Sequence, residues 1–182
     1  MHNEKGAQTM NETIKTLLDR RSCKSYLPKQ VVEAVLQLIL TAGTYAANGM
    51  ARQAPKILVL QDPEKIAKLE RLNASFMGNP DLKPFYGAPT VCWVLADPSV
   101  RTAVEDGSLV IGNMMAAAWS LGVGSCWIHR GKEEAASEEG KALLRKWGLP
   151  ENLKGVGNCI LGYAAEEPAA KPRLDGRIVK VD

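Results

Sequence analysis

The sequence predicts a single domain in which α-helices alternate with short β-strands. Its 182 residues are the usual length of one domain, and 46% of them are hydrophobic, which is enough for a core. Short apolar runs that stop at Asp-Pro indicate buried strands, whereas stretches with apolar residues every three or four positions indicate helices. Neither an internal repeat nor a linker is visible. We therefore expect residues 11–182 to form one domain after a mobile N-terminal tail of residues 1–10.

The first half of the chain carries three helix signals and one strand signal. Thr9 and Glu12 have the spacing of a capping box, and the helix that they open should end near Arg21. Pro28 suits the first turn of a second, well buried helix. In order, we expect helices over residues 9–21 and 28–43, a strand over residues 56–62 and a helix over residues 63–76.

The second half contains a helix that is apolar on almost every side. Residues 105–122 have one amide, Asn113, in an otherwise apolar middle. Such a helix must be enclosed, and a second copy of the chain covering one face would complete the enclosure, so we expect a homodimer. The remaining elements that we expect are strands over residues 88–97, 124–128 and 154–164 and a more exposed helix over residues 133–148.

The last segment, residues 165–182, is basic and reads as an extended arm. Within it, RIVKV at residues 177–181 alternates polar and apolar side chains, as an added edge strand would. We expect this strand to pair with a neighbouring chain.

Composition excludes several classes of function. The 23 basic residues are offset by 20 acidic ones, and a net charge of +3 gives no general reason to bind nucleic acid. No apolar stretch is long enough to span a membrane, and the N-terminus lacks the apolar segment of a signal peptide. The four cysteines contain no Cys-x-x-Cys pair, which indicates reduced, buried thiols and no metal site. We expect a soluble, cytoplasmic protein.

The stretch RRSCKSY at residues 20–26 gathers cationic side chains at the expected end of the first helix. Cations are favourable there without any ligand, because the C-terminal end of a helix carries partial negative charge. Ser22 between guanidinium and ammonium groups also suits a phosphate monoester. A second basic stretch, AKPR at residues 170–173, favours phosphate binding if the fold brings the two stretches together.

Two further segments suit a flat ligand. In residues 45–55 small residues surround Asn48 and Gln53, whose amides can hydrogen-bond the edge of a heterocycle, although an ordinary turn explains the same composition. Residues 121–131 combine glycines with Trp127, a broad apolar surface that a protein core also uses. His129 has no second histidine to support a serine triad or a metal site, apart from His2 in the tail. The usual phosphate-binding loops are missing, so side chains must hold any phosphorylated cofactor.

Taken in order, five stretches resemble the nitroreductase family of flavin enzymes. The similarity spans roughly residues 11 to 175 and includes RRSCKSY, YAANGMARQAP, YGAPTVCWVLAD, EDGSLVIGNMMAAAWSLGVGSCWI and ILGYAAEEPAAKPR. The resemblance implies an α+β fold with a central mixed or antiparallel sheet flanked by helices and a C-terminal arm packed on the partner subunit. It also implies a homodimer with one FMN at each of two sites, both formed by the two subunits.

The resemblance assigns cofactor-binding roles residue by residue. The phosphate and ribityl chain would be bound by Arg20, Arg21, Ser22 and Lys24, with Lys171 and Arg173 as the second basic element. The loop that the partner subunit lays beside the isoalloxazine corresponds to Asn48, Gly49, Met50, Ala51 and Gln53. Trp127 and Ile128 would line one face of the ring, and the backbone amides of His129 and Arg130 would approach its N5 and O4 edge.

The implied activity is hydride transfer from NADH or NADPH, through the flavin, to a nitroaromatic, a quinone or a similar planar acceptor, with no side chain needed as acid or base. Members often have Pro-Ser, a later Asn and Pro-Trp where this chain has Ala47-Asn48, Ala51 and Ala54-Pro55, so the substrate preference stays open. Two alternatives also stay open. One is a flavoenzyme of the same fold with other chemistry, such as reductive dehalogenation, flavin fragmentation or dehydrogenation. The other is a non-catalytic flavin carrier or sensor.

Overall fold

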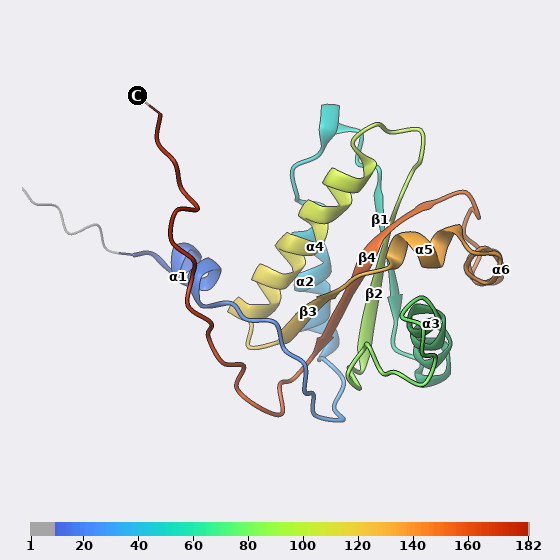
Figure 1. The fold of residues 1–182 in the computed structure, drawn as a ribbon, viewed down its shortest axis with the longest axis horizontal. Helices are drawn as coiled ribbons and strands as arrows, with labels where there is room; N and C mark the ends of the chain where they lie inside the picture. The colour runs from blue at the N-terminus through green and yellow to red at the C-terminus, as the bar shows by residue number, and fades with distance from the viewer. Residues whose placement is uncertain (1–9, 182) are drawn as a thin grey trace, which may run out of the picture.

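The computed structural model describes residues 10–181 and places a four-stranded sheet between two layers of helices (Figure 1). Every neighbouring pair of strands is antiparallel, and the order is β1-β2-β4-β3. The expected α+β fold with a sheet flanked by helices is thereby confirmed. The tail expected at residues 1–10, together with Thr9 and its capping box, lies outside the described residues apart from Met10. The strands are β1 (Pro55–Leu60), β2 (Thr90–Ala96), β3 (Gly124–Ile128) and β4 (Lys154–Gly162).

Both faces of the sheet are covered, which explains why the strands read as continuous apolar runs. In β2 every residue is buried, and alternate side chains enter two different cores. Val94 packs toward α2 (Glu33–Thr44) and α4 (Ala103–Ser120). Trp93 packs on the opposite face, which is covered by α3 (Pro63–Ser75), α5 (Gly131–Ala136) and α6 (Glu138–Lys146).

The first two helices are shorter than the sequence predicts. In α1 (Glu12–Asp19) the N-cap is Asn11, whose Oδ1 accepts the Ile14 N–H at 2.9 Å, and the helix ends before Arg21. The second helix begins at Glu33 and not at Pro28. Residues 28–32 instead cross one end of the sheet, where the Gln30 amide donates to the Pro89 carbonyl at 2.8 Å. This tertiary hydrogen bond outweighs the local helix signal.

The helix expected over residues 133–148 is two helices. Ser137 adopts an extended conformation (φ −74°, ψ 154°) and its Oγ accepts the Gly140 N–H at 3.0 Å, which ends α5 and caps α6. Gly140 lies so close to the Glu134 carbonyl that a side chain would not fit. The break therefore follows from a serine cap and a close backbone approach.

The segment after α1 pairs with the sheet and with the start of the C-terminal arm. Ser22 forms an isolated parallel bridge with Ser125 on the edge strand β3, and the Cys23 N–H donates to the Ser125 carbonyl at 2.9 Å. Residues 25–27 then bond residues 163–165, through Leu27 N–H to the Tyr163 carbonyl and Ala165 N–H to the Ser25 carbonyl, both at 2.9 Å. These bonds place residues 25–27 beside the start of the C-terminal arm.

Beyond β4, residues 166–181 form an extended arm that stands away from the sheet, as α1 also does (Figure 1). The arm contains no strand, and Ile178 is 86% exposed, so the edge strand expected at residues 177–181 does not form within this chain. On α4 the inner face is buried, yet Leu109 on the outer face is 49% exposed. Among the described helices, none is both long and apolar enough to cross a membrane.

Candidate functional site

The two basic stretches line one cavity of about 680 Å³. The first stretch arrives along β3, and the arm returns beside it because residues 163–165 pair with residues 25–27. The condition set by the sequence, that the fold should bring the two stretches together, is met. From the two stretches the cavity is lined by Arg20, Arg21, Ser22, Lys24, Ser25, Lys171 and Arg173, and Glu166 and Glu167 also contribute.

The two arginines of this cavity differ in what their guanidinium groups do. Arg21 Nη1 donates to the Leu18 carbonyl at 2.7 Å and to the Arg20 carbonyl at 2.9 Å, so it caps the end of α1. The helix-end interpretation therefore holds for Arg21. Arg20 Nη1 is buried and has no hydrogen-bond partner among the described residues. A buried, unpaired guanidinium donor is costly, and Arg20 Nη1 is therefore available to donate to a ligand oxygen.

A second hollow of about 340 Å³ adjoins the basic cavity and shares Ser22 and Lys24 with it. One wall is the end of β3 and the turn after it, which supply Cys126, Trp127, Ile128, His129 and Arg130. The other wall comes from α3 and the loop that follows, with Asn73, Met77, Pro84 and Tyr86. Lys24 Nζ lies 5.6 Å from the centre of the Tyr86 ring. The result is an elongated site with a cationic end and an end that contains the aromatic residues Tyr86 and Trp127.

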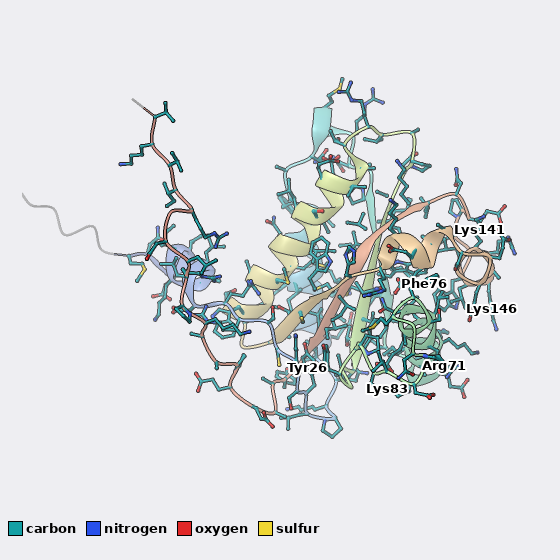
Figure 2. All side chains as sticks on the ribbon, in the orientation of Figure 1. Tyr26, Arg71, Phe76, Lys83, Lys141 and Lys146 are labelled. Carbon is teal, nitrogen blue, oxygen red and sulfur yellow. The ribbon has the colours of Figure 1, made fainter. Side chains whose placement is uncertain are left out.

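The turn at His129 and Arg130 is held in an unusual backbone conformation. Arg130 has φ +77°, in the left-handed region that favours glycine. Its Nε donates to the Phe76 carbonyl at 3.2 Å, and Phe76 follows α3 (Figure 2). The His129 carbonyl accepts from Asn73 Nδ2 at 2.8 Å. The partners of both hydrogen bonds, Asn73 and Phe76, lie at the C-terminal end of α3. These bonds fix the backbone conformation of the turn where it lines the hollow.

Behind this turn lies Glu134, a carboxyl group with no exposed surface. Burial raises its pKa to about 7, against the hydrogen bonds from Asn158 and Asn73, which lower it. Burial likewise raises the pKa of the Cys126 thiol in the hollow, which makes it a poor nucleophile. All four cysteines are buried and unbridged, as the sequence predicts.

The loop of residues 48–53 does not meet these cavities within one chain. Asn48 and Gln53 line a different, smaller pocket, and Met50, in the short helix η1 (Gly49–Ala51), is 85% exposed. The Gly49 N–H donates to Asp106 Oδ1 at 2.9 Å, at the start of α4, whereas the basic stretch lies beyond the other end of that helix. Eighteen residues of helix span about 27 Å, so this distance separates the loop from the basic stretch.

The loop itself is tightly organised although its tip is exposed. Met50, Ala51 and Gln53 all have positive φ, between 49° and 54°, which is strained for residues other than glycine. Asn48 Oδ1 accepts the Gln53 N–H at 2.9 Å, and buried Asp106 holds both Gly49 and the Thr102 hydroxyl. Strained backbone of this kind persists only where surrounding contacts hold it, and it clusters at functional sites.

Sequence reasoning missed several residues of the site. Asn73 and Tyr86 lie on α3 and in its following loop, which carried no site signal. Glu134 is one of four glutamates within residues 133–139, a segment whose pattern is typical of a solvent-exposed helix. Asp106 sits in the first turn of α4, where an acidic residue needs no further explanation. Only the tertiary contacts reveal these four positions.

Comparison with known proteins agrees with this architecture. The sequence profile described as "Nitroreductase family" matches residues 17–86 and 81–163. The nitroreductase with bound FMN from Bacteroides fragilis NCTC 9343 superposes with a TM-score of 0.87 and 31% identity, covering 94% of this chain and 100% of that one. The NAD(P)H FMN reductase of Bacillus subtilis (strain 168) is 27% identical over 187 residues, covering 91% of this chain and 71% of its own length. The NADPH-flavin oxidoreductase of Vibrio harveyi is 28% identical over 184 residues, covering 93% and 73%.

Proposed function

Because the chain belongs to the nitroreductase family, we propose that it is an FMN-dependent oxidoreductase that uses NADH or NADPH to reduce a small planar acceptor, such as a nitroaromatic or a quinone. The observation that carries the proposal is the elongated site, in which a cationic cavity continues into an aromatic hollow through Ser22 and Lys24. FMN matches this arrangement, because its phosphate suits the cationic cavity and its flat ring, joined to the phosphate by a chain, suits the aromatic hollow. When bound, FMN supplies the chemistry, accepting a hydride from the nicotinamide and passing two electrons to the acceptor.

In this proposal the residues divide between the two ends of the cofactor. Arg20, with its unpaired buried Nη1, and Ser22 bind the phosphate, with Lys171 and Arg173 closing the cavity from the arm. Trp127 and Ile128, which line the hollow, would contact the ring. The turn at His129 and Arg130 presents backbone amides to the reactive edge of the ring, in the conformation fixed by its hydrogen bonds to Asn73 and Phe76.

The shared site of a homodimer is part of the same proposal. The loop at residues 48–53 lies about a helix length from the basic stretch of its own chain, so a second copy would have to bring it to the ring. Apolar side chains are exposed along α1, the outer face of α4 and the arm, and a second copy would bury them. The most exposed of them are Leu17, Leu18, Leu109, Leu174, Ile178, Val179 and Val181.

An anaerobic titration of the FMN-loaded protein with NADH and with NADPH, followed at the flavin absorbance band, tests the activity. Bleaching by either donor, followed by recovery of the band on addition of a nitroaromatic or a quinone, is the expected result. A colourless protein that takes up no added FMN would refute the proposal. A bound flavin that neither donor reduces would favour the carrier or sensor, and reduction without transfer to these acceptors would favour other chemistry on the same fold.

The phosphate-binding role of Arg20 has its own test. Arg20→Ala should raise the FMN dissociation constant by about tenfold to a hundredfold, because a hydrogen bond to a charged group contributes about 1.5–3 kcal/mol. Fluorescence quenching of FMN by the protein measures this constant. Arg71→Ala is the matched control, since Arg71 is an exposed arginine on α3 that lines neither cavity (Figure 2). Equal affinities for the two variants would show that Arg20 does not bind the phosphate.

Mixing two variants tests the shared site. Arg20→Ala removes a phosphate ligand and Asn48→Ala disorders the loop, so homodimers of either variant have two impaired sites. In a heterodimer one site receives both changes and the other receives neither, and random pairing after mixing equal amounts leaves about one quarter of all sites intact. Recovery of this fraction of high-affinity FMN binding is expected. No recovery, in dimers shown to have exchanged subunits, would mean that each site is formed by one chain.

A further inference from the structure

Glu134 is a buried carboxyl group without a cation. Its Oε1 and Oε2 each accept from Asn158 Nδ2 at 2.9 Å, and Oε1 also accepts a short hydrogen bond from Asn73 Nδ2. No lysine or arginine within residues 10–181 forms an ion pair with it. A buried carboxylate that is served only by amide groups is an unfavourable arrangement, whereas the neutral acid tolerates it.

The carbonyl oxygens of the two amide side chains next to Glu134 accept no hydrogen bond within the described residues. Asn73 Oδ1 and Asn158 Oδ1 are buried and have no hydrogen-bond partner among the described residues. Both Glu134 oxygens face amide N–H groups and not these Oδ1 atoms, so the hydrogen bonds around Glu134 suit its charged form. Burial favours the neutral acid and outweighs these hydrogen bonds, so the pKa of Glu134 is raised to about 7 and small changes nearby can shift its proton occupancy.

The charges around Glu134 give no other explanation for a proton there. The packed elements contribute uncharged Asn73 from α3 and uncharged Asn158 from β4. The turn before α5 contributes His129 and Arg130, which line the hollow. Glu133, on the same helix, raises the pKa of Glu134 further. The proton affinity of Glu134 is therefore set mainly by its burial.

The same cluster holds the wall of the aromatic hollow. Asn73 Nδ2 donates both to Glu134 and to the His129 carbonyl, so one amide group links the buried carboxyl to the turn. The Glu134 N–H also donates to the Arg130 carbonyl at 2.9 Å. A change in the charge of Glu134 therefore alters the hydrogen bonds of the His129 and Arg130 carbonyl groups, and both residues line the hollow.

We propose that Glu134 is a positioning residue that binds one solvent proton when the ligand in the hollow gains negative charge and releases it when that charge is lost. The inference rests on the proposed function, in which the ligand is a flavin that is reduced. A carboxylate behind the hollow repels a negative ring, and a neutral acid does not, so reduction strengthens proton binding and proton binding favours reduction to the same extent. The proton adds to a carboxylate oxygen, no bond of the chain breaks, and the electrons come from NAD(P)H.

Proton uptake during reduction tests this role. The FMN-loaded protein is reduced photochemically in weakly buffered anaerobic solution at about pH 7.5, and an indicator dye reports the protons taken up. Relative to Glu134→Gln, the wild type should take up about half a proton more per flavin, because a group with a pKa near 7 is mostly ionised before reduction and mostly protonated after it. Glu139→Gln, which removes an exposed carboxyl on α6 that does not shift the pKa of Glu134, should match the wild type.

A second measurement needs no variant. The infrared difference spectrum between the reduced and oxidised wild type should contain a protonated-carboxyl band that shifts when the glutamates carry ¹³C. Equal proton uptake by the wild type and Glu134→Gln, or the absence of this band, would overturn the role of Glu134 while a reducible flavin left the proposed function standing. Failure of the wild type to bind or reduce FMN would overturn both.

Discussion

Replacing Asp106 by alanine should loosen the loop of residues 48–53 and cost a large share of the stability of the domain. Asp106 is only 3% exposed and accepts two hydrogen bonds, from the Gly49 N–H at 2.9 Å and the Thr102 hydroxyl at 3.0 Å. Each bond to a charged acceptor contributes about 1.5–3 kcal/mol, and an acidic side chain in the first turn of a helix contributes a few tenths more. Because Thr102 can partly satisfy its hydroxyl with water, we expect a loss of about 3 kcal/mol.

Urea unfolding followed by tryptophan fluorescence measures this loss, and limited proteolysis shows whether cleavage at residues 48–53 becomes faster. Asp97→Ala is the matched control. Asp97 also accepts from a backbone N–H and a hydroxyl, both of Ser99, at 2.8 and 2.7 Å, but it is exposed and does not contact the loop. Its loss should cost no more than about 1 kcal/mol. Equal losses for the two variants, or unchanged proteolysis of the loop in Asp106→Ala, would refute the anchoring role.

Other changes have expected effects as follows. The folded-state pKa of Glu134, about 7, lies above the ordinary value of 4.5, so its stabilising contribution is full at acid pH and is lost as the pH rises toward 7. Unfolding across this range should show the wild type losing about 3 kcal/mol relative to Glu134→Gln between about pH 4.5 and 8, and parallel curves would contradict the burial of a protonated acid. Gly107→Ala places a methyl group 2.6 Å from a methyl carbon of Val156 and should cost about 1–3 kcal/mol in urea unfolding. Leu109→Glu should produce monomers in sedimentation, whereas Leu82→Glu, which alters a similarly exposed leucine outside α4, should not.

The strands were the most predictable part of the fold. Each is a short apolar run bounded by turn residues, and burial on both faces of the sheet leaves little else that such a run could be. The helix boundaries were less predictable, because they depend on contacts that are remote in sequence. Pro28 is a sound local signal for the start of a helix. The hydrogen bond from the Gln30 side chain to the Pro89 carbonyl nevertheless keeps the chain non-helical until Glu33.

The candidate site divides in the same way. Arg20 and Lys171 could be named from the sequence because clusters of basic residues are visible without a structure. That the two clusters belong to one phosphate site was predicted from the resemblance to a family, since charge alone does not show it. Glu134 could not be named. A glutamate among other acidic residues on a short helix ordinarily faces water, and its burial follows from the break at Ser137, which the sequence pattern did not predict.

The position of α4 explains why the loop of residues 48–53 and the basic stretch do not meet within one chain. At its first turn Asp106 holds the strained loop. Just after its last turn, Gly124 lies so close to Cys23, in the basic stretch, that a Cβ on Gly124 would be 2.9 Å from Cys23 Cβ. A rigid helix of 18 residues fixes the separation at about 27 Å, which loop motion of a few residues does not close. Two copies related by a twofold axis that crosses the outer face of α4 would place each loop at the other chain's hollow, and the same contact would cover Leu109. In the proposed dimer, the exposure of α4 and the separation of the loop from the basic stretch are two consequences of one geometry, and a variant that separates the subunits should also lose FMN.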